Sequence, residues 1–478
     1  MSEKGKVVLA YSGGLDTSCL LKYLQDDGYD VVSCIAALGQ PSEERCDIDA
    51  VNEKAKKLGA VAAYDVDIRD EFAEDFIAKA IFANGLDAKK QKALDLGVLD
   101  CQVLDLRDEF SDEFLTKAIA ANSMYENKYP LLSALSRPAI CRHLVKVAQA
   151  EGAVAIAHGC TGKGNDQVRF ELECKALDPT LEILGPVRSW ELTTRSSEIE
   201  YAQSRGIPVD ATKENPYSID ENVWGRAIEC GVLEDPWNEA PKGAWAITVD
   251  PEDAPDEARD VVLGFEAGLP VSIDGQRMKL YDLIAALNEI VGSHGFGRID
   301  MIEDRLVGLK SRECYEQPGA LAIVMAHKQL ECLCLPGDVL HTKLQLEHDW
   351  SCQVYNGLWY SPLKDALDAF FASTQKTVTG EVRLHLYKGS CTVTGSRADS
   401  SMYDFGLATY DKGDTFDRTA AKGFMDLFGL PNRVWAERRV EREKAAGVVA
   451  AAQIAAMGQK QAEAAGSGEA GAEGTASK

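Results

Sequence analysis

The chain has 478 residues, of which 45% are hydrophobic and 27% are charged, a balance typical of a globular protein with two or three domains. Its net charge of −25 argues against a nucleic-acid partner, because affinity for nucleic acid depends on neutralising phosphates with Lys and Arg. Thirteen cysteines occur without a CxxC pair, which predicts free thiols in a reducing compartment and no structural zinc site.

The N-terminal residues and the apolar segments give no sign of targeting or of membrane insertion. Residues Met1–Lys6 are few and polar, so we expect no secretory signal. No run of about 18 apolar residues occurs, so we expect no membrane-spanning helix. Together with the unpaired cysteines, these features predict a cytoplasmic protein.

The first informative feature is a strand, a glycine turn and a helix near the N-terminus. Val7–Ala10 resembles a short buried strand, and near-helical spacing of apolar residues predicts a helix over Leu15–Gln25. The turn Ser12–Gly14 lets the backbone approach a ligand, and the helix start offers unpaired N–H groups that suit an anion. Ser12, Thr17 and Ser18 add hydroxyl donors. We interpret the segment as a cradle for nucleotide phosphates; the alternative is a tight turn that binds nothing.

A second apolar run, Val31–Leu38, predicts a parallel strand beside the first. Ala36 lies near the end of this run, where an adenine ring could rest, although simple sheet packing also explains an alanine there. The following segment predicts an amphipathic helix over Glu44–Leu58, ended by Gly59.

An internal repeat with a period of 38 residues comes next. Residues 52–84 align with residues 90–122, and 15 of the 33 aligned residues are identical, which predicts a duplicated helix–strand–helix unit. The second copy continues directly into Tyr125–Tyr129, so we take it as the functional copy. The first copy either adds a strand to the sheet edge, which is a pairing hazard, or loops out.

A glycine-rich loop between a strand and a helix is the second informative feature. We expect a helix from Pro138 to about Glu151, a strand over Val154–Ala157, and then a loop with three glycines over 158–165. Ligands of open α/β sheets bind at this edge. The side chains that follow could bind a zwitterionic small molecule; an N-capped helix with a surface Asp–Arg pair is the alternative. These side chains are Thr161, Asn165, Asp166 and Arg169.

Strands and helices alternate throughout this half, which predicts an α/β fold with a doubly wound parallel sheet. After residue 208 the segments become rich in turns, which predicts a second, α+β domain that covers the nucleotide site. We expect strands over Val261–Phe265 and Pro270–Ile273, a helix over Leu280–Val291, and a hairpin formed by Thr377–Leu386 and Ser390–Gly395.

Six segments within residues 5–435 together resemble the argininosuccinate synthases, a family of N-type ATP pyrophosphatases. The segments are AYSGGLDTS, HGCTGKGNDQVRFE, GVLEDPWNE, GRIDMIEDR, KSRECYE and RLHLYKG. The resemblance implies an adenine nucleotide α-hydrolase-like domain followed by a synthetase domain. It implies an ATP-dependent C–N ligase of arginine biosynthesis. In this family the citrulline ureido oxygen attacks the α-phosphate of ATP, and the aspartate amine then displaces AMP from citrullyl-adenylate to give argininosuccinate.

The resemblance also assigns roles to residues of this chain. It implies ATP contacts from Ala10, Tyr11, Ser12, Gly13, Gly14, Leu15, Asp16, Thr17, Ser18, Ala36 and Gly159. Aspartate contacts would come from Thr161, Asn165 and Asp166, and citrulline contacts from Tyr129, Asn165, Arg169, Ser218, Glu303 and Tyr315. We expect Ser12, Asp16, Thr17 and Asp166 to act in catalysis. Mg²⁺ is implied because the departing pyrophosphate must be neutralised, and without an acidic cage it would be held through the phosphates.

Two departures from the family pattern concern citrulline. Where the family carries a citrulline-binding Ser ahead of its Arg-Pro pair, this chain has Ala134, next to Ser133. In the helix expected after Tyr217-Ser218, a second such Ser is replaced by Ala227. Each lost hydrogen bond costs about 0.5–1.5 kcal/mol, so we expect a roughly 10- to 100-fold weaker citrulline site.

The expected organisation is an ATP-binding domain over 1–208, a synthetase domain over 209–435, a C-terminal helix over 436–465 and a disordered tail over 466–478. In the family the C-terminal helix reaches neighbouring subunits of a homotetramer, and Gly447 and Gly458 would weaken it here.

Two other functions remain open from the sequence. The duplication and the two alanines could mark a catalytically impaired homologue that keeps ATP binding and assembly. A tRNA thiolase or an amidotransferase synthetase could also use such a loop, but the acidic charge, the absence of CxxC and the absence of an N-terminal glutaminase Cys argue against both.

Overall fold

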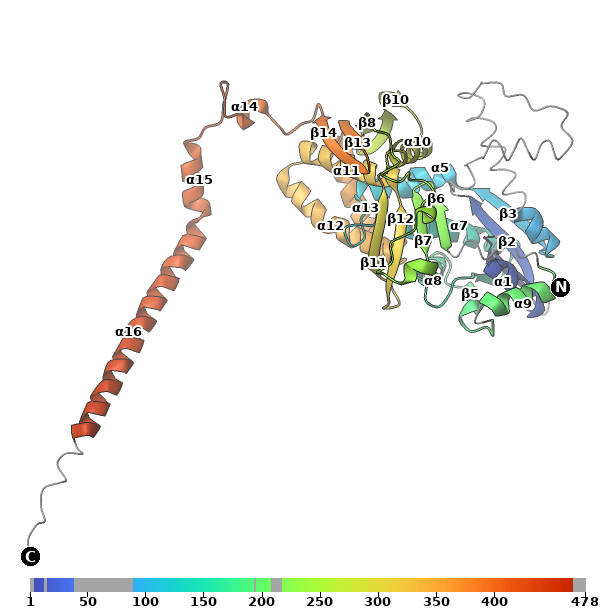
Figure 1. Ribbon diagram of the computed structural model, residues 1–478, viewed down its shortest axis with the longest axis horizontal. Coiled ribbons are helices and arrows are strands. Elements are labelled where there is room, and N and C mark those ends of the chain that lie inside the picture. The colour runs from blue at the N-terminus through green and yellow to red at the C-terminus, as the bar shows by residue number, and fades with distance from the viewer. Residues whose placement is uncertain (1–3, 13–14, 38–88, 193–194, 208–216, 467–478) are drawn as a thin grey trace, which may run out of the picture. The chain divides into compact units, whose positions relative to one another are not determined.

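The computed structural model describes residues 4–12, 15–37, 89–192, 195–207 and 217–466 (Figure 1). The chain divides into two compact units, residues 1–402 and 403–478. The predicted helix over Glu44–Leu58, the first copy of the repeat over 52–84, and residues 467–478 of the tail lie outside the described residues.

A five-stranded parallel sheet organises the N-terminal half, and the predicted doubly wound architecture is confirmed. Its strand order is β3-β2-β1-β4-β5. The chain moves outward from β1 on one side and then returns to the other side with β4, so the crevice between β1 and β4 is the switch point where such sheets bind ligands. The strands are β1 (Lys6–Ala10), β2 (Asp30–Ala37), β3 (Asp100–Asp105), β4 (Ala155–Ala157) and β5 (Glu182–Leu184).

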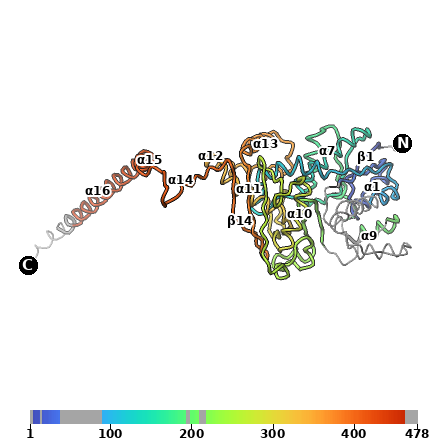
Figure 2. The backbone as a smooth tube through the Cα atoms, turned by 90° about the horizontal axis from the view of Figure 1, so that it is seen from above, coloured from blue at the N-terminus to red at the C-terminus, as the bar shows by residue number. Residues whose placement is uncertain are grey.

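Alternate residues of a strand point to opposite sides of the sheet, and here both sides carry apolar side chains. Helices therefore cover both faces of the sheet. Val7 and Leu9 pack against α1 (Leu15–Asp26) and α9 (Arg195–Ser204). Val8, between them, packs on the other face. That face is covered by α7 (Ser133–Glu151) and α8 (Asp166–Leu177), and Figure 2 shows α7 and α9 on opposite sides of β1.

The helix α7 spans Ser133–Glu151, so the expectation that it begins at Pro138 is wrong. Pro138 lies inside the helix, where its ring cannot donate the usual hydrogen bond. The first turn forms nevertheless, because Ala134 and Leu135 are completely buried and the Leu132 carbonyl accepts from the backbone N–H of Leu135 at 3.1 Å.

The second repeat copy has the predicted helix–strand–helix order. A helical stretch over 89–95 precedes β3, and a helix follows it. This second helix runs as α5 (Arg107–Glu109), a π-helical turn (Phe110–Leu115) and α6 (Thr116–Ala120).

The segment between α6 and α7 has an unusual backbone. Asn122, Glu126, Asn127 and Leu131 all have positive φ angles, which non-glycine residues rarely adopt. Surrounding contacts must therefore hold the segment in place. A buried cluster does so at its start.

In that cluster, Asn122 donates to Glu331 at 2.6 Å and to Glu347 at 2.8 Å. Lys343, which is completely buried, pairs with the same two carboxylates at 3.0 and 2.7 Å. The segment that carries Tyr125 and Tyr129 is thus anchored to the helices of the second half.

Two antiparallel sheets and four long helices occur in the remaining described residues of the first unit, in agreement with the expected α+β content. One sheet has the order β11-β12-β7-β6 and the other β10-β9-β8-β13-β14. The strands are β6 (Ser218–Asn222), β7 (Gly225–Glu229), β8 (Arg259–Glu266), β9 (Leu269–Ile273), β10 (Gln276–Arg277), β11 (Arg298–Asp304), β12 (Lys310–Glu316), β13 (Gly380–Tyr387) and β14 (Ser390–Arg397).

The prediction of a helix after Tyr217-Ser218 is wrong, because this segment forms the β6–β7 hairpin. Asn222 supports the tight turn by accepting from the Trp224 N–H at 2.8 Å. Gly225 follows with a positive φ, and a side chain there would collide with Gln317. β7 then pairs with β12, which places Ala227 opposite Tyr315.

The long helices are α10 (Leu280–Gly292), α11 (Pro318–Cys334), α12 (Gly337–Tyr355) and α13 (Pro362–Thr374). Short 3-10 turns lie at Pro186–Arg188, Gly231–Glu234, Lys242–Ala244 and Gln375–Thr377. The predicted free thiols are confirmed for the twelve cysteines of the described residues. Cys334 is buried, whereas Cys332 is exposed.

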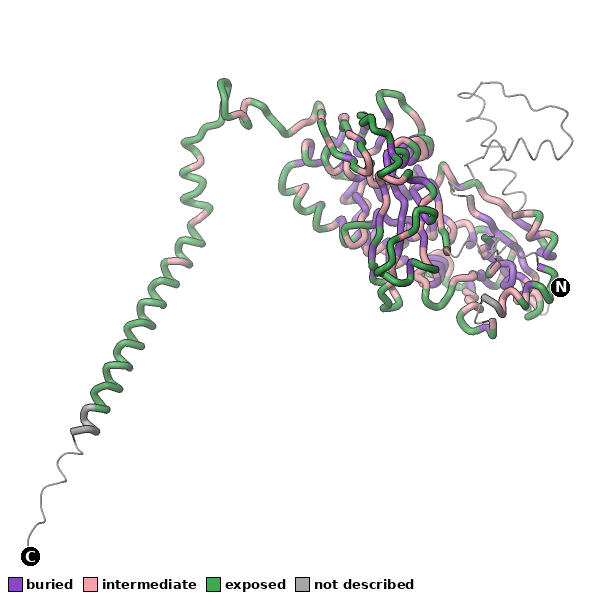
Figure 3. Tube along the Cα trace, viewed as in Figure 1, coloured by how far each residue is buried: buried purple, intermediate pink, exposed green. Residues whose placement is uncertain are grey.

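The second unit is helical. It contains α14 (Phe405–Ala408), α15 (Ala420–Phe428) and α16 (Leu430–Gly466), so the predicted C-terminal helix is confirmed and Gly466 belongs to it. Figure 3 shows buried segments throughout the first unit and an exposed α16. Within the described ranges, no helix is both long and apolar enough to cross a membrane.

Candidate functional site

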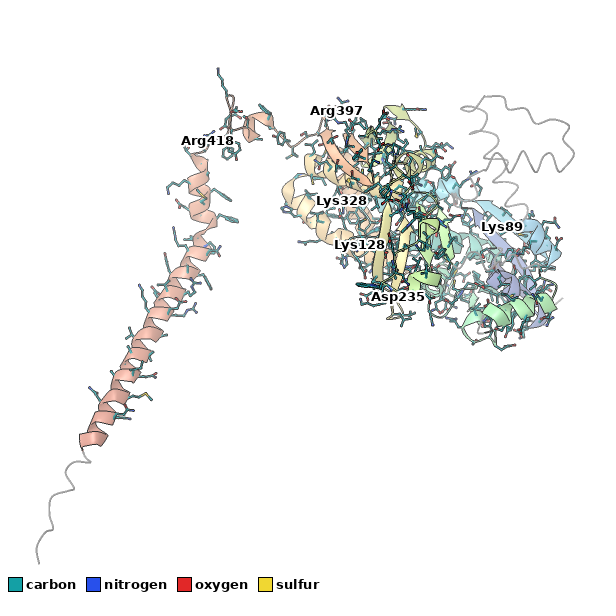
Figure 4. The ribbon with its side chains drawn as sticks, in the orientation of Figure 1. Lys89, Lys128, Asp235, Lys328, Arg397 and Arg418 are labelled. Carbon is teal, nitrogen blue, oxygen red and sulfur yellow. The ribbon has the colours of Figure 1, made fainter. Side chains whose placement is uncertain are left out.

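A cavity of about 480 Å³ opens at the carboxyl ends of β1, β2 and β4 and extends to β6, β7, β11 and β12. It therefore joins the two glycine loops to an antiparallel sheet that is distant in sequence. Lys89, labelled in Figure 4, also lines it. The expected site residues that line it are Ala10, Tyr11, Ser12, Asp16, Thr17, Ala36, Tyr129, Gly159, Thr161, Asn165, Asp166, Arg169, Ser218, Glu303 and Tyr315.

The nucleotide end of the cavity is lined by hydroxyl groups. Ser12 Oγ and Thr17 Oγ1 lie 3.0 Å apart at the start of α1. Ser18 Oγ is instead buried against the Tyr11 hydroxyl at 3.0 Å, and neither Ser18 nor Leu15 lines the cavity. A Cβ at Gly159 would lie 3.1 Å from Thr17 Cγ2, so glycine allows the second loop to approach α1. Gly13 and Gly14 lie outside the described residues.

Asp166 is the centre of an ionic network beside this end. It accepts from Arg137 at 2.7 Å and from Arg169 at 2.9 Å. Burial opposes the ionisation of Asp166, but the two guanidinium groups outweigh it and lower its pKa to about 2. Asp166 and Arg169 do form an ion pair, but Arg169 is only 4% exposed, so this is not the surface pair of the alternative interpretation.

Arg137 extends this network to the antiparallel sheet. Its Nη2 atom also donates to Asp220 of β6 at 2.5 Å, and the Ser133 hydroxyl donates to the same carboxylate. Asp166 at the start of α8 and Asp220 of β6 are thus held together by one guanidinium group.

Glu303 occupies the other end of the cavity, among tyrosines. The Tyr315 hydroxyl donates to its Oε2 atom and the Tyr355 hydroxyl to its Oε1 atom, both at 2.8 Å. Tyr129 stacks on Tyr315 with ring centroids 4.0 Å apart, and Tyr125 stacks on Tyr355 at 3.6 Å. Burial raises the pKa of Glu303, and the two phenols oppose this rise. Such a carboxylate suits a substrate ammonium group.

An ionic group centred on Arg305 connects the glycine-rich loop to the antiparallel sheet. Arg305 donates to Glu229 and Glu313, and to the carbonyl of Lys163 at 3.2 Å. Burial, with Glu229 and Glu303 nearby, raises the pKa of Glu313 to about 8. The loop that carries Thr161 and Asn165 therefore depends on residues of the second half for its position.

Sequence reasoning missed several residues that line the cavity. Arg137 precedes Pro138 in the segment that we compared with the family pattern, so the Arg-Pro pair was a usable signal for a site residue. The others come from strands and a helix end whose spatial neighbours the sequence does not reveal, namely Asp220, Glu229, Arg305, Glu313 and Tyr355.

The two alanines that depart from the family pattern have different surroundings. Ala227 lines the cavity, between Tyr315 and Asp220 in the sheet. Ala134 is completely buried in the apolar core and is not among the lining residues, whereas Ser133 is. Only the loss at Ala227 therefore falls inside the cavity.

The donor groups do not form a metal cage. Among the described residues, no three His, Cys, Asp or Glu side chains are grouped so that they could hold a metal ion.

Comparison with known families and proteins gives one consistent result. The N-terminal HUP domain model of arginosuccinate synthase matches residues 6–89 and 83–208, so each matched stretch contains one copy of the repeat. The C-terminal domain model of arginosuccinate synthase matches residues 217–435.

Similar full-length proteins carry the same name. An argininosuccinate synthase of Bacillus velezensis is 50% identical over 434 residues, which is 91% of this chain and 97% of that protein. One of Streptococcus gordonii is 47% identical over 441 residues, 92% of this chain and 100% of that protein. One of Bacillus subtilis is 49% identical over 434 residues, 91% and 97% of the two chains.

Among solved structures, the U34-tRNA thiolase NcsA from Methanococcus maripaludis matches with a TM-score of 0.23 and 13% identity, over 44% of this chain and 59% of that one, a likeness too low to carry an argument. The two domain models span most of the chain, and relatives about half identical cover nine tenths of it. The chain belongs to the argininosuccinate synthase family.

Proposed function

We propose that this chain joins citrulline and aspartate at the expense of ATP and yields argininosuccinate, AMP and pyrophosphate. Membership of the family makes the chain an ATP-using ligase. The observation that supports these substrates most directly is the cavity, which is lined by all eight residues expected to contact the two amino acids.

The proposed nucleotide contacts are the groups around the β1 loop. Ser12 and Thr17 offer hydroxyls, and the start of α1 offers backbone N–H groups to the phosphates. Ala36 and Gly159 would lie against the rest of the nucleotide. Asp16 lines the same end of the cavity and is the carboxylate nearest in sequence to the phosphate turn.

The proposed amino-acid contacts follow from charge. Glu303 would accept the α-ammonium group of citrulline, and its phenol partners would keep it ionised against burial. The cationic pair Arg137 and Arg169 beside Asp166 would bind carboxylates and stabilise charge that develops on the α-phosphate. Thr161 and Asn165 would hold aspartate next to them.

Further parts of the proposal concern the metal, the assembly and the domains. Mg²⁺ would enter on the phosphates of ATP, where it would neutralise the leaving pyrophosphate. We propose a cytoplasmic homotetramer joined through the C-terminal helix. We also propose domain limits of 1–208 and 209–435, followed by the helix of 436–465.

The test is pyrophosphate release from ATP and Mg²⁺, with citrulline and aspartate each added and withheld. The proposal expects release that depends on citrulline and argininosuccinate that forms only when aspartate is present. Pyrophosphate release indifferent to citrulline would refute it. No release from protein that still binds ATP would favour the impaired homologue.

Two substitutions in one strand sharpen the test. Glu303→Gln removes the negative charge of Glu303 from the cavity. It should raise the KM for citrulline about 10- to 100-fold, because the charge-assisted hydrogen bond to the citrulline ammonium group is lost. Asp300→Asn, on the exposed side of β11, should leave that KM unchanged.

A further inference from the structure

The hydroxyl of Tyr355 is the junction of three segments that are far apart in sequence. It donates to Glu303 Oε1 at 2.8 Å and accepts from Asn165 Nδ2 at 2.8 Å. Asn165 Oδ1 in turn accepts from the backbone N–H of Leu306 at 2.8 Å. One phenol therefore links the start of α8, the end of β11 and the end of α12.

The ring and backbone of Tyr355 are fixed independently of this hydroxyl. The side chain is 1% exposed, and its ring stacks on Tyr125. The Tyr355 carbonyl accepts from Arg169 Nε at 3.0 Å. Gly357, two residues later, has a φ of +72°, and a Cβ there would lie 2.9 Å from Arg169 Cα. Glycine thus lets the end of α12 approach α8 closely enough to form this contact.

We propose that Tyr355 is a positioning residue for both amino-acid substrates: its hydroxyl sets the spacing between Glu303 and Asn165 and keeps Glu303 available as a carboxylate. The proposal rests on the proposed function, in which Glu303 contacts citrulline and Asn165 contacts citrulline and aspartate. It predicts that Tyr355 affects both amino acids and leaves ATP unaffected. Among the described residues, its hydroxyl contacts Asn165, Glu303 and the Asp304 carbonyl, all of them outside the β1 loop.

The hydroxyl also bears on the protonation of Glu303. Each phenol donor favours the carboxylate, so losing one raises the pKa of Glu303 further. Binding of an ammonium group then requires a higher pH. The charged and titratable groups that face Glu303 are Arg169 from α8, Arg305 after β11, Glu313 and Tyr315 from β12, Tyr129 before α7, and Tyr125 and Tyr355.

The experiment compares Tyr355→Phe with Tyr360→Phe in the full-length protein. Tyr360 lies five residues away and donates its hydroxyl to the Pro138 carbonyl at 2.8 Å, outside the cavity lining. Tyr355→Phe should raise the KM for citrulline and for aspartate about 10-fold each, and leave the KM for ATP within about 2-fold. The acidic limb of kcat/KM for citrulline should move to higher pH. Tyr360→Phe should change none of these.

A second variant keeps the proposal testable if Tyr355→Phe destabilises the folded protein. Tyr355→difluorotyrosine keeps the ring and the hydroxyl but makes the hydroxyl a stronger donor, so the acidic limb of kcat/KM for citrulline should move to lower pH. The proposal is overturned if Tyr355→Phe leaves both KM values and the limb unchanged, if it raises the KM for ATP equally, or if the fluorinated residue does not shift the limb downward. If the wild-type protein releases no pyrophosphate, the proposed function fails instead, and citrulline binding by calorimetry then tests Tyr355 alone.

Discussion

Restoring a hydroxyl at Ala227 should strengthen citrulline binding, whereas restoring one at Ala134 should not. Ala227 lines the cavity opposite Tyr315, so the hydroxyl of Ala227→Ser can reach a ligand there. A single neutral hydrogen bond contributes about 0.5–1.5 kcal/mol, which corresponds to about 2- to 12-fold tighter binding. Calorimetric titration with citrulline in the presence of a non-hydrolysable ATP analogue measures this change.

Ala134→Ser is the matched comparison, because it adds the same atom at a completely buried position. The Pro130 carbonyl, four residues earlier in the chain and outside α7, already accepts from Ser123 and Trp224. We therefore expect Ala134→Ser to lower the free energy of unfolding by about 1–3 kcal/mol, measured in urea, with no gain in citrulline affinity. Tighter citrulline binding by Ala134→Ser, with no effect of Ala227→Ser, would refute this assignment of the two positions.

Three further substitutions test the ionic groups. Asp166→Asn removes the negative charge between two buried guanidinium groups and should lower kcat for pyrophosphate release at least about 100-fold, with circular dichroism as the check on folding. Glu173 is completely buried, and burial raises the pKa of its carboxyl group well above the usual range. The folded state therefore holds the carboxyl proton more tightly than the unfolded state does, and the protein loses stability as the pH rises above about 4.5. Glu173→Gln should accordingly gain stability relative to wild type between pH 5 and pH 8 in urea unfolding, and a constant difference would contradict this. Lys343→Met leaves Glu331 and Glu347 without their buried cation and should cost about 3–5 kcal/mol of unfolding free energy, whereas a loss below 1 kcal/mol would show that the carboxylates find other partners.

The local sequence predicted the parallel sheet and its two glycine loops because each follows from short-range patterns. Apolar runs and glycine turns locate β1, β2 and β4, and the order of strands along the chain then places their carboxyl ends at one edge. The second repeat copy was predictable for the same reason.

The errors have a shared physical origin in contacts made at long range. Pro138 has the usual appearance of a helix start, but burial of the preceding turn extends α7 backward to Ser133. The segment after Ser218 forms a hairpin because β12, some ninety residues later, pairs with it. Tyr355 acquires its role only when the two halves of the first unit meet, and no local pattern marks it, whereas the Arg-Pro pair was a local signal for Arg137.

The two stacked tyrosine pairs give the cavity an optical signature. Tyr129 with Tyr315 and Tyr125 with Tyr355 lie close enough for their ring transitions to couple, and both pairs surround one carboxylate. A cation placed beside Glu303 changes the electric field at these rings. Near-ultraviolet circular dichroism can therefore follow occupancy of the amino-acid site directly, without turnover and without an added label.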